Sequence, residues 1–194
     1  MGDAAEDLRK AHELPEGDVI RILLEQHAQV KELFKQLTSA STTVDRQQTF
    51  DQLRTMLAVH ETAEELILRP VSSKVAGQQV ADARDQEEHE ANKVLAELEK
   101  MDVDSPEFAE QIKAFEKAVS DHAEAEETQE FPQVLAQCDA EERQKMGKRL
   151  SAAEKVAPTH AHPSAAGSTA AQAVLGPFAS IVDRTRDAIA KAGD

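Results

Sequence analysis

HETAEELILRP at residues 60–70 and HAEAEETQEFP at residues 122–132 are two copies of one pattern. In both, a histidine is followed by a glutamate four residues later and by a proline ten residues later. The second copy begins 62 residues after the first, and EQHAQVKEL at 25–33 is echoed by EEHEANKVL at 87–95 with the same offset. The chain is therefore predicted to contain two copies of one helix pair.

The apolar residues around these copies follow the three- and four-residue steps of amphipathic helices. The first helix is predicted to begin after Asp18, an N-cap, and the second after Thr42 or Thr43. Pro70 is predicted to end the second helix, because proline lacks the N–H that a helix interior uses. The inward stripe of the first helix is Ile20, Leu23, Leu24, His27, Val30, Phe34 and Leu37.

Two further helices are predicted in the second copy. One covers about residues 78–101, and the other begins at Ser105 and Pro106, an N-cap followed by proline at the first helical position. The latter continues to about residue 150 with a kink at Pro132. Four helices of similar length with short connections predict an all-α, up-down-up-down four-helix bundle.

The bundle is expected over residues 17–150, after a polar and flexible N-terminus at 1–16. A linker rich in Ala, Ser, Pro and His follows at 151–172. Residues 173–194 have helical apolar spacing, which predicts an amphipathic C-terminal helix that docks on the bundle or on a partner.

Composition excludes several classes of function. With 37 acidic against 22 basic residues, the net charge of −15 argues against nucleic-acid binding and against adhesion to an anionic membrane. The single cysteine excludes thiolate-rich metal sites, and the absence of tyrosine excludes a tyrosyl radical. No apolar run approaches a membrane span and the N-terminus is too polar for a signal peptide, so we expect a soluble, cytoplasmic protein.

Each predicted helix carries one histidine in phase with its apolar stripe. Helical residues four apart lie on one face, so each HxxxE pair can bind the same metal, or its carboxylate can bridge two. One such pair is common by chance, but four imidazoles in an apolar core without a metal would carry a large desolvation cost. The predicted metal ligands are His27, His60, Glu64, His89, His122 and Glu126.

Other polar residues near these positions are less decisive. Glu61, directly after His60, is expected to reach the metal or to hydrogen-bond its ligands. Further candidates for the same roles are Asp85, His160 and His162. The solvated face is expected to hold Glu65, Glu88, Glu124 and Glu127.

The order His, HxxxE, His, HxxxE over about residues 18–135 resembles the hemerythrin-like HHE cation-binding family. This resemblance implies a non-haem centre of two Fe ions in a four-helix bundle. By the same resemblance His27 and His60 bind one iron, His89 and His122 bind the other, and Glu64 and Glu126 bridge them together with an oxo or hydroxo group. Iron is expected, although zinc or manganese can occupy the same donors.

The chain departs from the oxygen-carrier form of that family, which has a further histidine one turn from the first on the third helix. Asp85 and Lys93 stand there instead. Open metal positions favour reaction with small oxidants over reversible O2 carriage. We therefore expect a protein acting on O2, NO or H2O2, with catalase-like peroxide breakdown as the first hypothesis. The alternatives are an O2, NO or iron sensor acting through the tail helix, and an acidic helical adaptor without stoichiometric metal.

Overall fold

The computed structural model describes residues 3–155, and within that range the chain forms helices, turns and short loops only. The α-helices are α1 (Ala4–His12), α2 (Val19–Ser39), α3 (Thr43–Ala63), α4 (Arg69–Val75), α5 (Gln78–Leu98), α6 (Pro106–Ala125), α7 (Phe131–Gln137) and α8 (Ala140–Glu154). Two π-helical turns, η1 (Glu64–Leu68) and η2 (Glu126–Glu130), join α3 to α4 and α6 to α7.

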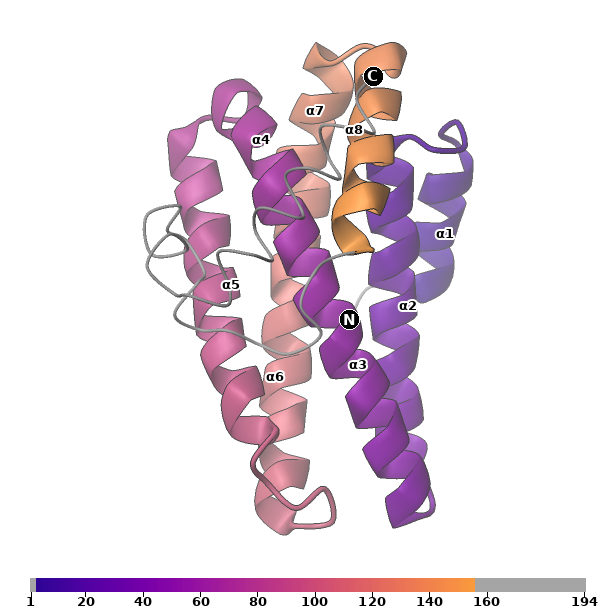
Figure 1. The fold of residues 1–194 in the computed structure, drawn as a ribbon, viewed down its shortest axis with the longest axis vertical. Helices are drawn as coiled ribbons and strands as arrows, with labels where there is room; N and C mark the ends of the chain where they lie inside the picture. Colours follow the sequence, from indigo (N-terminus) through magenta and orange to yellow (C-terminus); the bar gives the residue numbers. More distant parts are fainter. Residues whose placement is uncertain (1–2, 156–194) are drawn as a thin grey trace.

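Four long members make the predicted bundle. They are α2, the continuous α3–η1–α4, α5, and the continuous α6–η2–α7. In Figure 1 the turns from α2 to α3 and from α5 to α6 lie at one end, while α4, α7 and α8 lie at the other. The predicted caps are confirmed, since Asp18, Thr42 and Ser105 each accept a hydrogen bond from a backbone N–H in the first turn.

The prediction that Pro70 ends the second helix is wrong. Pro70 lies at the start of α4, directly after η1, and the helix runs on to Val75. In η1 the Arg69 N–H bonds to the Glu64 carbonyl, five residues earlier. The turn before the proline is therefore one residue wider than an α-turn, which relieves the clash that a proline ring makes with the preceding turn. Pro132 follows η2 in the same way.

The N-terminus is not flexible over all of residues 1–16 as expected, because residues 4–12 form α1. Asp3 caps this helix. Ala11 is fully buried in the core, and the Asp7 carboxylate, itself 2% exposed, accepts a hydrogen bond from Lys31 on α2. The helix is held by its packing on α2, which its polar sequence does not reveal.

Helix α8 packs against α2 and α3 and buries Met146 and Leu150. It ends at Glu154, so the bundle unit extends a few residues beyond the predicted boundary at 150. The remainder of the predicted linker and the predicted C-terminal helix at 173–194 lie outside the described residues.

The core is divided into two apolar clusters. One, toward the α7–α8 end, includes Leu23, Leu68 and Val134, and the other, toward the α5–α6 turn, includes Phe34 and Phe115. Between them lies a layer of buried polar side chains contributed by all four bundle members. The fold therefore places its polar groups in the middle of a long helical core, away from the loops.

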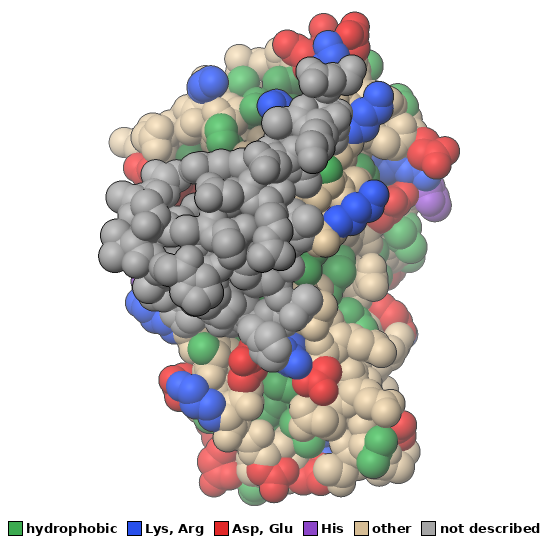
Figure 2. Space-filling view, viewed as in Figure 1, with side chains coloured by type: hydrophobic (Ala, Val, Ile, Leu, Met, Phe, Trp, Pro, Cys, Tyr) green, Lys and Arg blue, Asp and Glu red, His purple; other side chains and the backbone are tan. Residues whose placement is uncertain are grey.

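The surface shown in Figure 2 carries its Lys and Arg side chains scattered among acidic ones. None of the helices in residues 3–155 has the length and apolar character needed to cross a membrane.

Candidate metal centre

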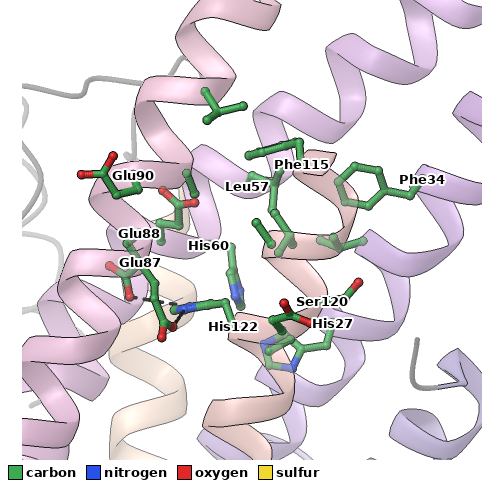
Figure 3. A pocket seen from close by; sticks show the side chains of 18 of the residues that line it. His27, Phe34, Leu57, His60, Glu87, Glu88, Glu90, Phe115, Ser120 and His122 are labelled. Carbon is green, nitrogen blue, oxygen red and sulfur yellow. Dashed lines mark hydrogen bonds and ion pairs between the residues drawn. The ribbon is translucent and has the colours of Figure 1, made fainter. Parts of the chain in front are cut away.

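Two groups of metal-ligating side chains meet in the polar layer. In each, one donor atom per residue lies within 4.8 Å of the others. The first group is His27, His60, Glu64 and Glu126. The second group is Glu64, Glu88, His122 and Glu126. Both thus contain Glu64 and Glu126, and Figure 3 shows the three imidazoles converging from different helices.

Glu126 lies between two imidazoles. Its Oε2 is 3.4 Å from His27 Nε2, and its Oε1 is 3.4 Å from His122 Nε2. Glu64 Oε2 is 3.3 Å from His60 Nε2. Neither glutamate side chain is exposed. The two oxygens of Glu126 therefore face opposite halves of the layer, as a carboxylate that bridges two ions requires.

An outer hydrogen bond fixes each of the three imidazoles. His60 Nδ1 lies 2.7 Å from Gln26 Oε1, and His122 Nδ1 lies 2.8 Å from Glu87 Oε2. His27 Nδ1 lies 3.2 Å from Glu127 Oε1. Because each partner atom is an acceptor, each Nδ1 carries the proton and Nε2 is directed at the carboxylates. Outer partners of this kind orient metal-binding histidines.

The electrostatics differ between the His60–Glu64 pair and the His122–Glu126 pair. Burial, together with the nearby His27, lowers the pKa of His60 to about 3, so its Nε2 keeps a free lone pair. Burial and the proximity of Glu126 raise the pKa of Glu64 well above its usual range. Burial also opposes the charge of Glu126, but contacts with His122 and His27 outweigh it and hold the pKa of that carboxyl well below its usual range.

Arg69 is the buried cation beside the second group. Its guanidinium hydrogen-bonds to Glu130 at 2.8 and 2.9 Å, to Glu126 at 3.3 Å and to Glu88. In an unbroken α-helix a residue five positions after Glu64 would point about 140° away from it. The π turn η1 adds a residue to the turn and so brings Arg69 round to the face of the layer.

The structure does not bring His89 into the layer. His89 is half-buried and belongs to neither group, whereas Glu88 is 6% exposed and is in the second group. Along α5 the buried stripe runs through Ala81, Arg84, Glu88, Asn92, Leu95 and Leu98. His89 is one residue out of phase with this stripe, and the structure does not bring it together with the other candidate ligands, although its Nδ1 is buried without a hydrogen-bond partner among the described residues.

The other candidates have different surroundings. Glu61 is buried beside Glu88 and Asn92, and burial followed by the charge of Glu88 raises its pKa to about 8, but it belongs to neither group. Asp85 pairs with Arg69 at 3.0 Å. His160 and His162 lie outside the described residues.

Two of the acidic residues expected on the solvated face are at the site instead. They are Glu88 and Glu127, whose side chains are 6% and 7% exposed. Glu127 also accepts a hydrogen bond from Lys10 of α1 at 2.9 Å. The N-terminal helix α1 thus contacts Glu127, the residue that hydrogen-bonds to His27.

The sequence from residue 18 to residue 134 matches the hemerythrin HHE cation-binding domain. The chain belongs to this family. It is 26% identical over 138 residues to an uncharacterized hemerythrin-like protein of Schizosaccharomyces pombe. This match covers 70% of this chain and 68% of that protein. It is also 26% identical over 137 residues to a DNA nickase of a Nostoc species, but this match covers 71% of this chain and only 38% of the nickase.

A solved structure supports the fold. The crystal structure of a hemerythrin HHE cation-binding domain-containing protein from Mycobacterium kansasii superposes with a TM-score of 0.60 and covers 99% of both chains at 17% identity. This member of the cation-binding family is therefore a helical bundle with candidate metal ligands in its core.

Proposed function

We propose that this chain holds two iron ions in the polar layer and reacts through them with small oxidants, hydrogen peroxide first among them. The observation that carries the proposal is that Glu64 and Glu126 belong to both ligand groups. A carboxylate offers two oxygens with several lone pairs, so each glutamate can serve two ions. Helical bundles build such centres from inward Glu and His side chains on facing helices.

The polar atoms of the layer fit a pair of metal ions. Both carboxylate oxygens of Glu64, one oxygen of Glu126, and Nε2 of His27 and His122 are buried without a hydrogen-bond partner among the described residues. Each unsatisfied buried group costs about 1–3 kcal/mol, and a cation among them removes that cost. Mixed imidazole and carboxylate donors suit iron, with zinc and manganese as competitors.

The two positions would be unequal. The first group supplies two imidazoles, whereas the second supplies one imidazole and Glu88 besides the two shared glutamates. Residues of both groups line a cavity, His27 and His60 from the first and Glu88 and His122 from the second, so both positions border space that a small molecule can enter. When bound, a pair of iron ions supplies the exchange of electrons with peroxide or dioxygen, while the protein supplies orientation and charge.

The protein's own contribution is to hold the donors still. Gln26, Glu87 and Glu127 each fix one imidazole through Nδ1. Arg69 holds Glu126 and Glu88 and offsets part of their negative charge. A rigid donor set keeps the ions in place while a small molecule enters and leaves.

The experiment is metal analysis of the iron-loaded protein, combined with oxygen evolution after addition of H2O2. We expect about two irons per chain in the wild type and about one in Glu88→Ala. The matched control is His89→Ala, which changes the neighbouring residue on α5 and should keep both irons.

Each outcome decides a separate part of the proposal. Less than about one iron per chain in the wild type overturns the metal centre. Loss of iron in His89→Ala with retention in Glu88→Ala overturns the ligand assignment. Two irons without oxygen evolution above that of free iron remove peroxide breakdown and indicate reversible binding of O2 or NO, as in a sensor.

A further inference from the structure

Next to the polar layer lies a cavity of about 470 Å³. It extends from His60 and His122 toward the apolar cluster of Phe34 and Phe115, as Figure 3 shows. Cavities that bind organic ligands measure about 300–1,000 Å³, and an apolar cavity of about 150 Å³ already holds benzene. A water molecule occupies about 30 Å³. The space is therefore far larger than peroxide, dioxygen or nitric oxide requires.

The wall of the cavity is mostly apolar, with polar side chains at the metal-ligand end and toward the surface. Val30, Phe34, Leu57, Phe115 and Val119 contribute the side that faces away from the histidines. Such a wall gains from contact with hydrocarbon and gives water few hydrogen bonds. A ligand that fits would direct an apolar body along this wall and one end toward the polar layer.

The mouth of the cavity lies between α5 and α6. Gln86, Glu90 and Val94 are exposed at successive turns of α5, and Ala114 and Ala118 are exposed on α6. The short side chains on α6 leave a passage between the two helices, where larger residues would cover it. The cavity thus opens to the surface on one side of the bundle and does not depend on a loop.

The charged side chains that line the cavity are paired within the described residues, except at the metal-ligand end, where Glu61 Oε2 and Nε2 of His27 and His122 have no hydrogen-bond partner. Lys31 is bound by Asp7 and lies 3.7 Å from Glu127. Glu88 is bound by Arg69, and Glu61 hydrogen-bonds to Asn92. A charged group placed along the apolar part of this space would be desolvated without a free partner, which is costly.

We propose that the cavity binds an uncharged, apolar organic molecule, the size of a two-ring aromatic or a ten-carbon chain, with one end at His60 and His122. This deepens the proposed function, because it names the class of molecule that would reach the metal ions. It does not depend on iron, since the wall and the mouth are formed by the protein alone.

The test uses metal-free protein and the uncharged fluorophore N-phenyl-1-naphthylamine. We expect saturable fluorescence enhancement with one site per chain. Ala118→Leu narrows the mouth and should weaken binding about tenfold. The matched control is Ala109→Leu, the same change at an exposed position of α6 outside the cavity lining, which should leave binding unchanged. Thermal unfolding of both variants shows that they fold.

Competition against the fluorophore tests the charge of the ligand. Decanol should displace it, whereas decanoate and decylammonium at the same chain length should be at least about tenfold weaker. Equal displacement by either ion overturns the uncharged class. An absence of saturable binding, or an equal loss in both leucine variants, overturns the site. Because these measurements need no iron, their failure leaves the metal proposal standing, and a failure of iron loading leaves this one standing.

Discussion

Glu64 and Glu130 are both fully buried carboxylates on the ligand-bearing helices, yet their surroundings are opposite. Neither oxygen of Glu64 accepts a hydrogen bond from a described residue, and its nearest imidazole, His60, is kept neutral by burial, which lowers its pKa to about 3. Glu130 receives two hydrogen bonds from Arg69, at 2.8 and 2.9 Å. Replacing each by leucine should therefore change the free energy of unfolding of the metal-free protein in opposite directions.

The magnitudes follow from what each carboxylate contacts. Glu64→Leu removes an unsatisfied buried group, which should stabilise the metal-free protein by about 2–3 kcal/mol and raise its Tm by roughly 4–12 °C. Glu130→Leu removes one partner of a buried ion pair and should destabilise it by about 3 kcal/mol, the lower end for such a loss, because Arg69 keeps its other carboxylates.

The assay is thermal unfolding after chelation, repeated with zinc as a redox-inert metal. Zinc at a hundred times its Kd stabilises a one-site protein by about 2.7 kcal/mol. With zinc, the free energy of unfolding of the wild type should rise by at least this much and that of Glu64→Leu hardly at all. The difference in stability between the two proteins should therefore shrink or change sign when metal is added. A metal-free Glu64→Leu protein less stable than the wild type would refute the conclusion that this carboxylate is held at a cost in order to bind an ion.

Substitutions at three further positions test other contacts. Gly147→Ala should lower the free energy of unfolding by about 1–3 kcal/mol by calorimetry, despite the better helix propensity of alanine, because the added Cβ would meet the Gly17 carbonyl oxygen at 2.0 Å; a raised Tm would contradict this. Asp18→Ala should lower the free energy of unfolding in urea by about 3 kcal/mol, because it removes both the helix cap and the ion pair with Arg143. Asp18→Asn should cost about 1 kcal/mol less, because asparagine keeps the cap but not the ion pair. Equal losses in the two variants would show that the cap contributes nothing. Glu127→Ala should weaken zinc binding about 10–100-fold by titration calorimetry, because it frees the imidazole it orients, and unchanged affinity would remove that role.

The bundle and most of the inward positions could be predicted because helical periodicity is a local property of the sequence. A spacing of seven residues, two helical turns, joins the candidate ligand histidines to large buried apolar side chains on three helices. The pairs are His27 with Phe34, Leu53 with His60, and Phe115 with His122. On α5 the buried Leu95 lies seven residues after Glu88 and six after His89. The spacing of apolar residues on α5 thus predicts that Glu88 faces the core, whereas the 62-residue repeat predicts that His89 does.

Other features depend on contacts between distant segments and have no local signal. Helix α1 has nine residues, too few to be stable alone, and Lys10 and Asp7 attach it to side chains far along the chain. The second helix continues through Pro70 because a π turn precedes the proline, and no residue type in the sequence predicts that turn. Arg69 likewise reaches the site only because of that turn.

The π turns also bear on how an ion reaches the two central carboxylates, which do not line the cavity. Glu64 and Glu126 are fully buried, and each is the first residue of a π turn. A π turn interrupts the regular hydrogen-bond ladder, so local opening of these long helices is easiest at the turns that carry the ligands. An arriving ion would meet its donors during such an opening and then hold the turn closed. Metal binding would in this way slow amide exchange at residues 65–69 and 127–131 and suppress local opening of the bundle at these turns.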